Sequence, residues 1–207
     1  MRGFTREAEP AELAAASVAL TAVWQSRVDA ATPGHPAAWT WGPEKSGKTV
    51  RDHILPVLKK QTGSHCSYCD LYFVAAGSVE SVDHFRPKAK GRWPALAYTW
   101  SNLFYACGAC QSEKQERFDE RVIKPDEPGY DWMAHFRFNT ITGFLVPRGG
   151  TTQERLRARV TIKLFGLNQR DRPKARLRAY KDWIELGRPS VRGRSYRFCL
   201  VPPDRSK

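Results

Sequence analysis

Four of the five cysteines stand in two pairs with metal-ligand spacing: Cys66 with Cys69, and Cys107 with Cys110. Two C-x-x-C pairs, here called the zinc knuckles, can supply the four thiolates of one tetrahedral Zn²⁺ site. An ion with four protein ligands has no open position, so we expect it to stabilise the fold and not to catalyse. A redox pair is the alternative, which two knuckles in one basic protein make less favourable. Cys199 is left over, and we expect a half-buried thiol.

An Asp-His pair, Asp83 and His84, lies between the zinc knuckles. Hydrolysis of a phosphodiester needs a base to activate water, and a hard divalent cation can stabilise the developing charge. A neutral histidine can take the proton near pH 7, and a carboxylate can hold the cation. The pair therefore predicts His84 as general base and Asp83 as metal ligand. Neighbouring strand residues face opposite sides, so this requires the strand to end or bulge here; a surface pair without a task is the alternative.

Basic residues follow the Asp-His pair, and the whole chain carries a formal net charge of +13. Such an excess favours a polyanionic partner, of which nucleic acid is the commonest. We therefore predict that the segment after His84 contacts nucleic-acid phosphates. The predicted contacts are Arg86, Lys88, Lys90 and Arg92. A solvated basic surface is the plainer alternative.

The N-terminal half is predicted to contain two helices and a hairpin. Apolar residues about one helical turn apart predict a helix from Pro10 to Val28 and another from Val50 to Lys60 that ends at Gly63. Leu71–Ala75 and Val79–His84 are typical of two paired strands joined by a turn. A short exposed helix is expected over 109–118.

The C-terminal half is predicted to contain a hairpin near Thr142-Gly143 and two helices. The first helix runs from Thr152 to about Gly166, and Asn168 is expected to cap the second. The inward positions are expected to be Leu156, Val160, Leu164 and Leu167 in the first helix, and Leu177, Tyr180, Trp183 and Ile184 in the second. The opposite face of the second helix is basic and includes Arg176, and a mobile basic tail is expected from Arg188.

These elements predict an α+β fold in four regions. Residues 1–49 would form an N-terminal helix and loop, 50–120 the core with the four cysteines, 121–187 an aromatic excursion with a helical pair, and 188–207 the tail. No apolar run approaches the roughly 20 residues that span a bilayer, and the first residues lack the apolar stretch of a signal peptide. We therefore expect a cytoplasmic protein that does not interact with membranes.

Residues 42–49 match the phosphate-binding pattern G-x-x-x-x-G-K-[ST], with Lys48 as its lysine. Such a loop functions when a buried strand precedes it and a helix follows. The preceding residues are a poor buried strand, and no later apolar run ends in a suitable aspartate. We therefore favour a polar loop that leads into a helix, with a nucleotide-hydrolysing enzyme as the less favoured alternative.

The central region resembles the HNH endonucleases, whose core is the ββα-metal fold. The resemblance rests on Cys-x-Tyr-Cys at 66–69, Val-Asp-His-Phe-Arg-Pro-Lys at 82–88, and Trp-Ser-Asn-Leu-x-x-x-Cys-x-x-Cys-x-x-x-Lys at 100–114. More narrowly, the chain is similar to the HNH subunits of retron and Septu anti-phage systems. That similarity extends over roughly residues 45–185 and implies a zinc-stabilised ββα-metal core with flanking helices.

The resemblance also implies roles for single residues. Asp83 would bind Mg²⁺ or Mn²⁺, His84 would be the base, and Asn102 would orient the catalytic loop. Gln111 stands where the family usually has Asn or His as a second metal ligand, and Lys114 would contact phosphate. Glutamine is one methylene longer than asparagine, so Glu113 or Glu80 could be needed to complete the site.

The function implied is a metal-dependent nuclease, acting on DNA in preference to RNA, that serves as the effector of an anti-phage complex. A partner ATPase subunit would control cutting, and the aromatic excursion and the N-terminal helix are candidate docking surfaces. The altered position at Gln111 raises the alternative of a catalytically impaired, zinc-stabilised nucleic-acid-binding module.

Overall fold

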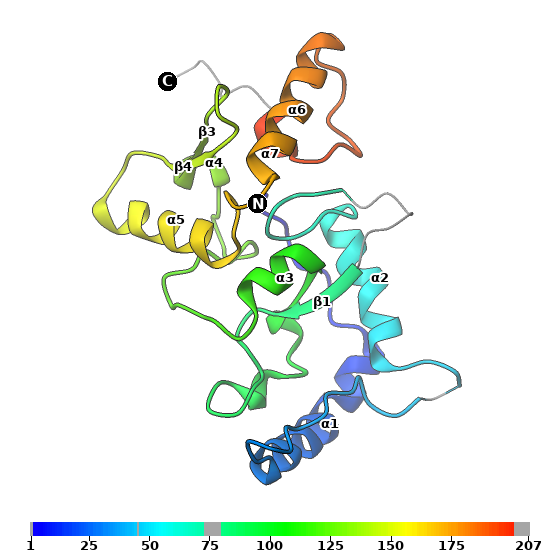
Figure 1. The fold of residues 1–207 in the computed structure, drawn as a ribbon. Helices are drawn as coiled ribbons and strands as arrows, with labels where there is room; N and C mark the ends of the chain where they lie inside the picture. Colours follow the sequence, from blue (N-terminus) through cyan, green and yellow to red (C-terminus); the bar gives the residue numbers. More distant parts are fainter. Residues whose placement is uncertain (1, 45, 73–79, 201–207) are drawn as a thin grey trace.

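The computed structural model describes residues 2–44, 46–72 and 80–200, which form a mixed α+β fold with two small antiparallel sheets (Figure 1). The helices are α1 (Ala11–Ala30), α2 (Val50–Thr62), α3 (Gly108–Lys114), α4 (Trp132–His135), α5 (Thr152–Leu164), α6 (Arg172–Glu185) and α7 (Arg197–Leu200), with short 3-10 turns η1 (Pro94–Leu96) and η2 (Trp100–Asn102). The strands are β1 (Glu80–His84), β2 (Leu103–Cys107), β3 (Phe136–Phe138) and β4 (Leu145–Pro147). The predicted α+β class is therefore confirmed.

The central unit is the pair of strands β1 and β2 with helix α3 directly after β2. Asp83 pairs with Phe104 and His84 with Leu103, in a regular antiparallel register. Every residue of β2 is buried, because α2 and α3 both pack against this strand. Most of the expected first strand, residues 73–75, and the expected turn at 76–78 lie outside the described residues.

Helices α1 and α2 begin and end close to the predicted positions. Pro56 lies inside α2, which nevertheless continues to Thr62 and ends at Gly63 with φ 60°. Glycine adopts this left-handed conformation without a steric penalty, which is why the helix ends there. Helix α3 ends four residues earlier than the expected 109–118 helix, and its Cys110 and Lys114 are buried, not exposed.

Of the positions predicted to face inward on α5, Leu164 is buried and Val160 packs against the core, but Leu156 does not. Leu156 is exposed, whereas Ala158, Thr161 and Leu164 are buried. The Thr161 hydroxyl accepts a hydrogen bond from the backbone N–H of Ile123 (2.9 Å) and donates one to the carbonyl of Arg157 (2.8 Å). These partners make a buried threonine favourable, so the core face of α5 includes a polar residue that the apolar pattern did not identify.

The second C-terminal helix, α6, is attached through a buried arginine that the sequence assigned to the exposed basic face. The Arg176 guanidinium is fully buried and donates to the carbonyls of Gly143 (3.0 Å) and Leu167 (2.6 Å) and to the Asn168 side-chain oxygen (2.8 Å). Asn168 is therefore not the helix cap, and Asp171 occupies the N-cap position. The arginine fixes α6 to the β3–β4 hairpin, which forms around Gly143 as predicted.

The segment from Arg188 to Leu200 is part of the packed fold and not a mobile tail. Helix α7 buries Phe198, Cys199 and Leu200, so the fifth cysteine is fully and not half buried. Burial raises the pKa of the Cys199 thiol, which keeps it protonated. Residues 201–207 of the predicted tail lie outside the described residues. Among the described helices, none has the length and apolar character needed to cross a bilayer.

Candidate metal centre and the Asp83–His84 site

The four knuckle cysteines form one buried cluster, as predicted. Their sulfur atoms all lie within 4.8 Å of one another, and the Cys69 and Cys107 sulfurs are 3.7 Å apart. Zinc–sulfur bonds of about 2.3 Å in a tetrahedron place the sulfurs about 3.8 Å apart. None of the four is in a disulfide. The cluster therefore has the spacing and donor set to bind a metal such as zinc.

Local backbone structure brings the two knuckles together. The first knuckle follows the end of α2, and the second joins the end of β2 to the start of α3. The backbone N–H of Cys107 donates to the Cys66 sulfur and that of Cys110 to the Cys107 sulfur, both at 3.4 Å. The backbone N–H of Ser67 donates to the carbonyl of Tyr105 (2.8 Å), which ties the first knuckle to β2.

An arginine supplies positive charge beside the cysteine cluster. Burial lowers the pKa of Arg172, but the charges of the four cysteines outweigh this and raise it. Its guanidinium is held by the carbonyls of Phe165 (2.5 Å) and Gly166 (3.1 Å). A Zn²⁺ ion with four thiolates carries a net charge of −2, so a fixed cation nearby favours the loaded site.

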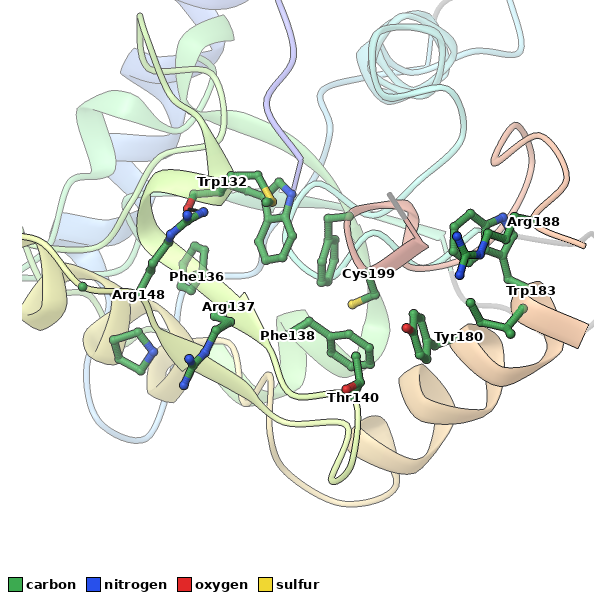
Figure 2. Close-up of a pocket in the computed structure, with 15 residues that line it drawn as sticks. Trp132, Phe136, Arg137, Phe138, Thr140, Arg148, Tyr180, Trp183, Arg188 and Cys199 are labelled. Atoms are coloured by element: carbon green, nitrogen blue, oxygen red, sulfur yellow. Dashed lines mark hydrogen bonds between the residues drawn. The ribbon is translucent and has the colours of Figure 1, made fainter. Parts of the chain in front are cut away.

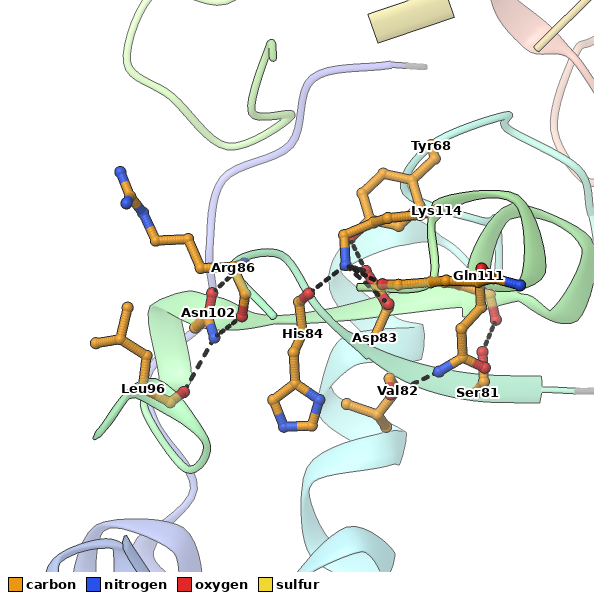
Figure 3. A network of polar contacts seen from close by, with 12 residues as sticks. Tyr68, Ser81, Val82, Asp83, His84, Arg86, Leu96, Asn102, Gln111 and Lys114 are labelled. Atoms are coloured by element: carbon orange, nitrogen blue, oxygen red, sulfur yellow. Dashed lines mark hydrogen bonds and ion pairs between the residues drawn. The ribbon is translucent and has the colours of Figure 1, made fainter. Parts of the chain in front are cut away.

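Asp83 is buried in a network of polar contacts between β1 and α3 (Figure 3). The Tyr68 hydroxyl donates to its Oδ2 (2.7 Å), and the Lys114 ammonium lies 3.2 Å from the same oxygen. Lys114 also donates to the carbonyl of His84 (2.6 Å). Burial raises the pKa of Asp83, while Lys114 and Tyr68 act in the opposite direction. The carboxylate therefore already has a cation, which comes from the protein.

His84 points to the other side of β1 and is held in one orientation. Its Nε2 lies 2.8 Å from the carbonyl of Ala97, and its ring stacks on Trp41 and meets the edge of Trp39. Burial lowers the pKa of His84 well below its usual value, with smaller contributions from Lys88 and Lys114. A carbonyl can only accept, so Nε2 carries the proton and Nδ1 is unprotonated. Nδ1 has no hydrogen-bond partner among the described residues.

The expected metal-binding pair of Asp83 and Gln111 is not formed. Gln111 is half-buried, and its Nε2 makes a long hydrogen bond to the carbonyl of Val82 (3.5 Å) (Figure 3). Asp83 is occupied by Lys114, and His84 faces away because adjacent residues of a regular strand alternate. Of the two residues expected to complete the site, Glu80 pairs with Lys59 (2.7 Å) and Glu113 with Arg170 (3.3 Å).

Asn102 is buried and connects two segments that lie close to His84. Its side-chain oxygen accepts from the backbone N–H of Arg86 (2.8 Å), and its Nδ2 donates to the carbonyls of Arg86 and Leu96, both at 3.0 Å. The residue after Leu96 is Ala97, whose carbonyl holds the imidazole. Asn102 thus ties the turn after β1 to the segment that orients His84.

The five predicted phosphate contacts are not equally available. Arg86 pairs with Glu120 (2.8 Å). Lys88 is half-buried and lies over the ring of Trp39 (4.6 Å), while Lys90 donates to the carbonyl of Ala31 (2.7 Å) at the end of α1. Arg92 is exposed, and its side chain has no partner within the described part of the chain.

Lys114 does not face a phosphate, because it is 1% exposed and its ammonium is used inside the fold. This corrects the prediction that it contacts the substrate. The contact was implied by the resemblance, and the polar residues of 109–118 predicted an exposed helix around it. Its partners, Asp83 and the carbonyl of His84, come from β1 and become neighbours only when α3 packs against that strand.

Sequence reasoning assigned no role to Tyr68, Trp39 or Trp41, which complete the surroundings of Asp83 and His84. The position of Tyr68 between the first two cysteines was the available signal. The i, i+2 spacing of the two tryptophans placed them on one side of an extended segment, but not against a particular residue. His65, directly before the first knuckle, uses its ring nitrogens with the carbonyls of Gly63 (2.5 Å) and Arg194 (3.0 Å).

The phosphate-loop pattern at 42–49 lacks the structural setting of such a loop. Residues 37–41 before it contain no strand, although a helix does follow. The Thr49 hydroxyl and its backbone N–H both donate to Asp52 Oδ2 at 2.8 Å, so they close the first turn of α2. This arrangement favours the polar helix-leading loop over a nucleotide site.

Comparison of the chain with protein-family models and with curated proteins finds no match. Its function is therefore argued from the residues of this site and from the resemblance of its motifs to the HNH endonucleases.

Proposed function

We propose that the protein is an HNH-type nuclease that hydrolyses phosphodiester bonds of nucleic acid, with DNA as the preferred substrate. The observation that carries the proposal is the setting of His84: a buried imidazole at the end of β1, oriented by the carbonyl of Ala97 and with its pKa lowered by burial. A general base must be unprotonated and fixed in direction at the working pH, and both conditions support this role.

In this proposal the chain's own residues position and activate the attacking water. His84 Nδ1 takes the proton, while the carbonyl of Ala97 keeps the ring from rotating. Asn102 holds the supporting loop. The Lys88 ammonium lies over the ring of Trp39, and the same ring contacts His84. In the proposal, this ammonium attracts the phosphate that the water attacks.

The family resemblance implies a catalytic Mg²⁺ or Mn²⁺, and the described arrangement does not fit one at Asp83. Lys114 and Tyr68 occupy the carboxylate, and the Gln111 amide is directed at Val82. Accordingly, no step is assigned to a divalent ion here. The zinc cluster does fit its ion, and in the proposal it keeps β2 and α3 in place.

The test is nicking of supercoiled plasmid DNA by the purified protein, with Mg²⁺, with Mn²⁺ and with no added divalent ion. His84→Ala should abolish nicking, with a loss of at least about 100-fold, because general-base catalysis contributes that much. His53→Ala is the matched control, since His53 lies on α2 and pairs with Glu12 (3.3 Å) away from the site. Equal nicking by wild type and His84→Ala would refute the assignment.

A second candidate is a nucleic-acid-binding module that is stabilised by zinc and does not cut. The contact between Lys114 and Asp83 favours it, because an internal ammonium satisfies the carboxylate that would otherwise bind the ion. This candidate predicts binding that weakens steeply with salt. It also predicts no nicking with any divalent ion, so the same assay separates the two.

A role in anti-phage defence and control by a partner ATPase are proposed from the resemblance alone. Both predicted docking regions expose a large apolar side chain, namely Val18 on α1 and Ile141 in the aromatic excursion, at 82% and 83% exposure. Affinity purification of the native protein should retain an ATPase if the proposal is correct. Val18→Asp should weaken that association, and recovery without an ATPase under gentle conditions would contradict it.

A further inference from the structure

A cavity of about 820 Å³ lies between the β3–β4 hairpin and helices α4, α6 and α7 (Figure 2). Its volume is in the range of sites that hold a small ligand or a short segment of a larger one. None of the residues around Asp83 and His84 lines it. A ligand here would therefore be bound by a second site.

Aromatic rings make up much of the cavity wall. They are Trp132, Phe136, Phe138, Tyr180, Trp183 and Phe198. Phe138 and Tyr180 meet edge to face with ring centres 5.5 Å apart, and the ring centres of Trp132 and Phe198 are 4.8 Å apart. Tyr180 is only half-buried, and its hydroxyl has no hydrogen-bond partner in the described ranges 2–44, 46–72 and 80–200. The wall thus presents aromatic faces and edges together with an unused polar group.

The charge around the cavity is of one sign. Its lining residues include Arg137, Arg148 and Arg188 and no aspartate or glutamate. Arg137 is exposed, with no side-chain partner in the part of the chain that the structure describes. Arg148 donates to the carbonyl of Met133 (2.8 Å), and Arg188 lies over the ring of Trp183 (6.0 Å). The cavity therefore favours an anion.

The arginines stand on opposite sides of the aromatic wall. Figure 2 shows Arg137 and Arg148 on the hairpin side and Arg188 on the far side beside Trp183, with Phe138 and Tyr180 between them. A ligand that fits this arrangement has an aromatic centre and negative charge on both flanks. A nucleotide within a strand has this form, because its sugar carries the base and is linked to one phosphate on the 5′ side and another on the 3′ side.

We propose that this cavity binds single-stranded nucleic acid, with one base against Tyr180 and Phe138 and the flanking phosphates at Arg137 and Arg188. Base–aromatic stacking requires an unpaired base, so a duplex does not fit. A free nucleotide offers a phosphate on one side only, and an acidic peptide offers no flat ring system. The proposal does not rest on His84 and holds whether or not the protein cuts.

The test is anisotropy of a fluorescein-labelled oligothymidylate, measured with the full-length protein and no added divalent ion. Arg137→Gln should weaken binding about tenfold and lower the slope of log K against log salt by about one, because one phosphate contact is lost. Arg178→Gln is the matched control: it removes the same charge from an exposed position on α6 that does not line the cavity. Tyr180→Ala should cost about tenfold, and Tyr180→Phe should retain binding because the ring remains.

Each result decides the proposal. It is overturned if Arg178→Gln weakens binding as much as Arg137→Gln, since the charge of the whole surface would then explain the affinity. Adenosine monophosphate binding as tightly as the oligonucleotide would show a free-nucleotide site, and tighter binding of a poly-glutamate peptide would show a protein site. Because the readout is binding, absence of plasmid nicking leaves this result unaffected.

Discussion

Lys114 is a lysine inside the protein, and its surroundings explain how that is possible. Its ammonium lies against the Asp83 carboxylate and the carbonyls of His84 and Gln115. A buried charge is stable only when such partners replace water. Asp83 and Lys114 are consequently a unit, in which neither residue can be changed without leaving an unpaired charge in the interior.

Lys114→Met should therefore lower the free energy of unfolding by about 3–5 kcal/mol, the usual cost of removing one partner from a buried ion pair. Urea unfolding followed by circular dichroism would measure it. Lys174→Met is the matched control, because Lys174 is 85% exposed and its pair with Asp171 is in solvent, where such pairs contribute little. A loss below about 1 kcal/mol for Lys114→Met would contradict the structural assignment.

His84 should make stability depend on pH below about 6.5. Burial, with Lys88 on the following loop and Lys114 on α3, depresses its pKa in the folded state, so the unfolded chain binds a proton that the folded chain does not. The contribution of neutral His84 to the free energy of unfolding is fully present above its pKa in the unfolded chain, about 6.5, and is lost as the pH falls through and below that value. The expected slope relative to His84→Gln approaches about 1.4 kcal/mol per pH unit. Parallel pH profiles of the two proteins in urea unfolding would refute this.

At the scale of elements, the β3–β4 hairpin and α6 depend on one glycine. A Cβ atom at Gly143 would lie 2.0 Å from the carbonyl oxygen of Pro173 at the start of α6, and its φ of 75° disfavours any other residue. The carbonyl of Gly143 also accepts a hydrogen bond from the buried Arg176 guanidinium. The approach of helix to hairpin therefore requires a residue without a side chain at this position.

Gly143→Ala should lower the free energy of unfolding by about 2 kcal/mol or more, because both the contact and the backbone conformation are strained. Thermal unfolding would measure the change. Gly149→Ala, in the segment just after β4, is the matched control, since its Cβ would meet nothing within 4 Å. Equal melting temperatures for the two variants would show that α6 can move away from the hairpin at no cost.

The sequence predicts most described elements because apolar periodicity and glycine stops are local signals. Helices α1 and α2 and the hairpin around Gly143 follow from them. The same periodicity misassigns Arg176 and Lys114, because it places every charged residue outside. Their burial depends on carbonyls and a carboxylate supplied by other elements, and no local pattern carries that information.

At the scale of the whole molecule, the cysteine cluster joins segments about 40 residues apart in the chain and so fixes where β2 ends and α3 begins. Its spacing could be predicted because a metal site needs specific residue types at short intervals. The direction in which the Asp83 side chain points could not be predicted from the sequence, because it depends on how the regular strand β1 packs against α3.

The purified protein should contain one zinc ion per chain by elemental analysis. Cys110→Ser should lose the ion and unfold at a lower temperature, since structural zinc binding contributes about 10–16 kcal/mol in small zinc-finger peptides. Cys199→Ser is the matched control, because Cys199 is buried outside the cluster and should leave the zinc content unchanged. Full zinc content in Cys110→Ser would refute the four-thiolate site.

The C-terminal elements also return to the first zinc knuckle. The Arg197 side chain donates to the buried Asp70 carboxylate (Nε to Oδ1, 3.1 Å), and the backbone N–H of Tyr196 donates to the Asp70 carbonyl (2.8 Å). Asp70 directly follows Cys69 in the chain. During synthesis on the ribosome, this aspartate lacks its partner until residue 197 has been added. We therefore expect the region around the first knuckle to reach its final structure only after helix α7 has emerged from the ribosome.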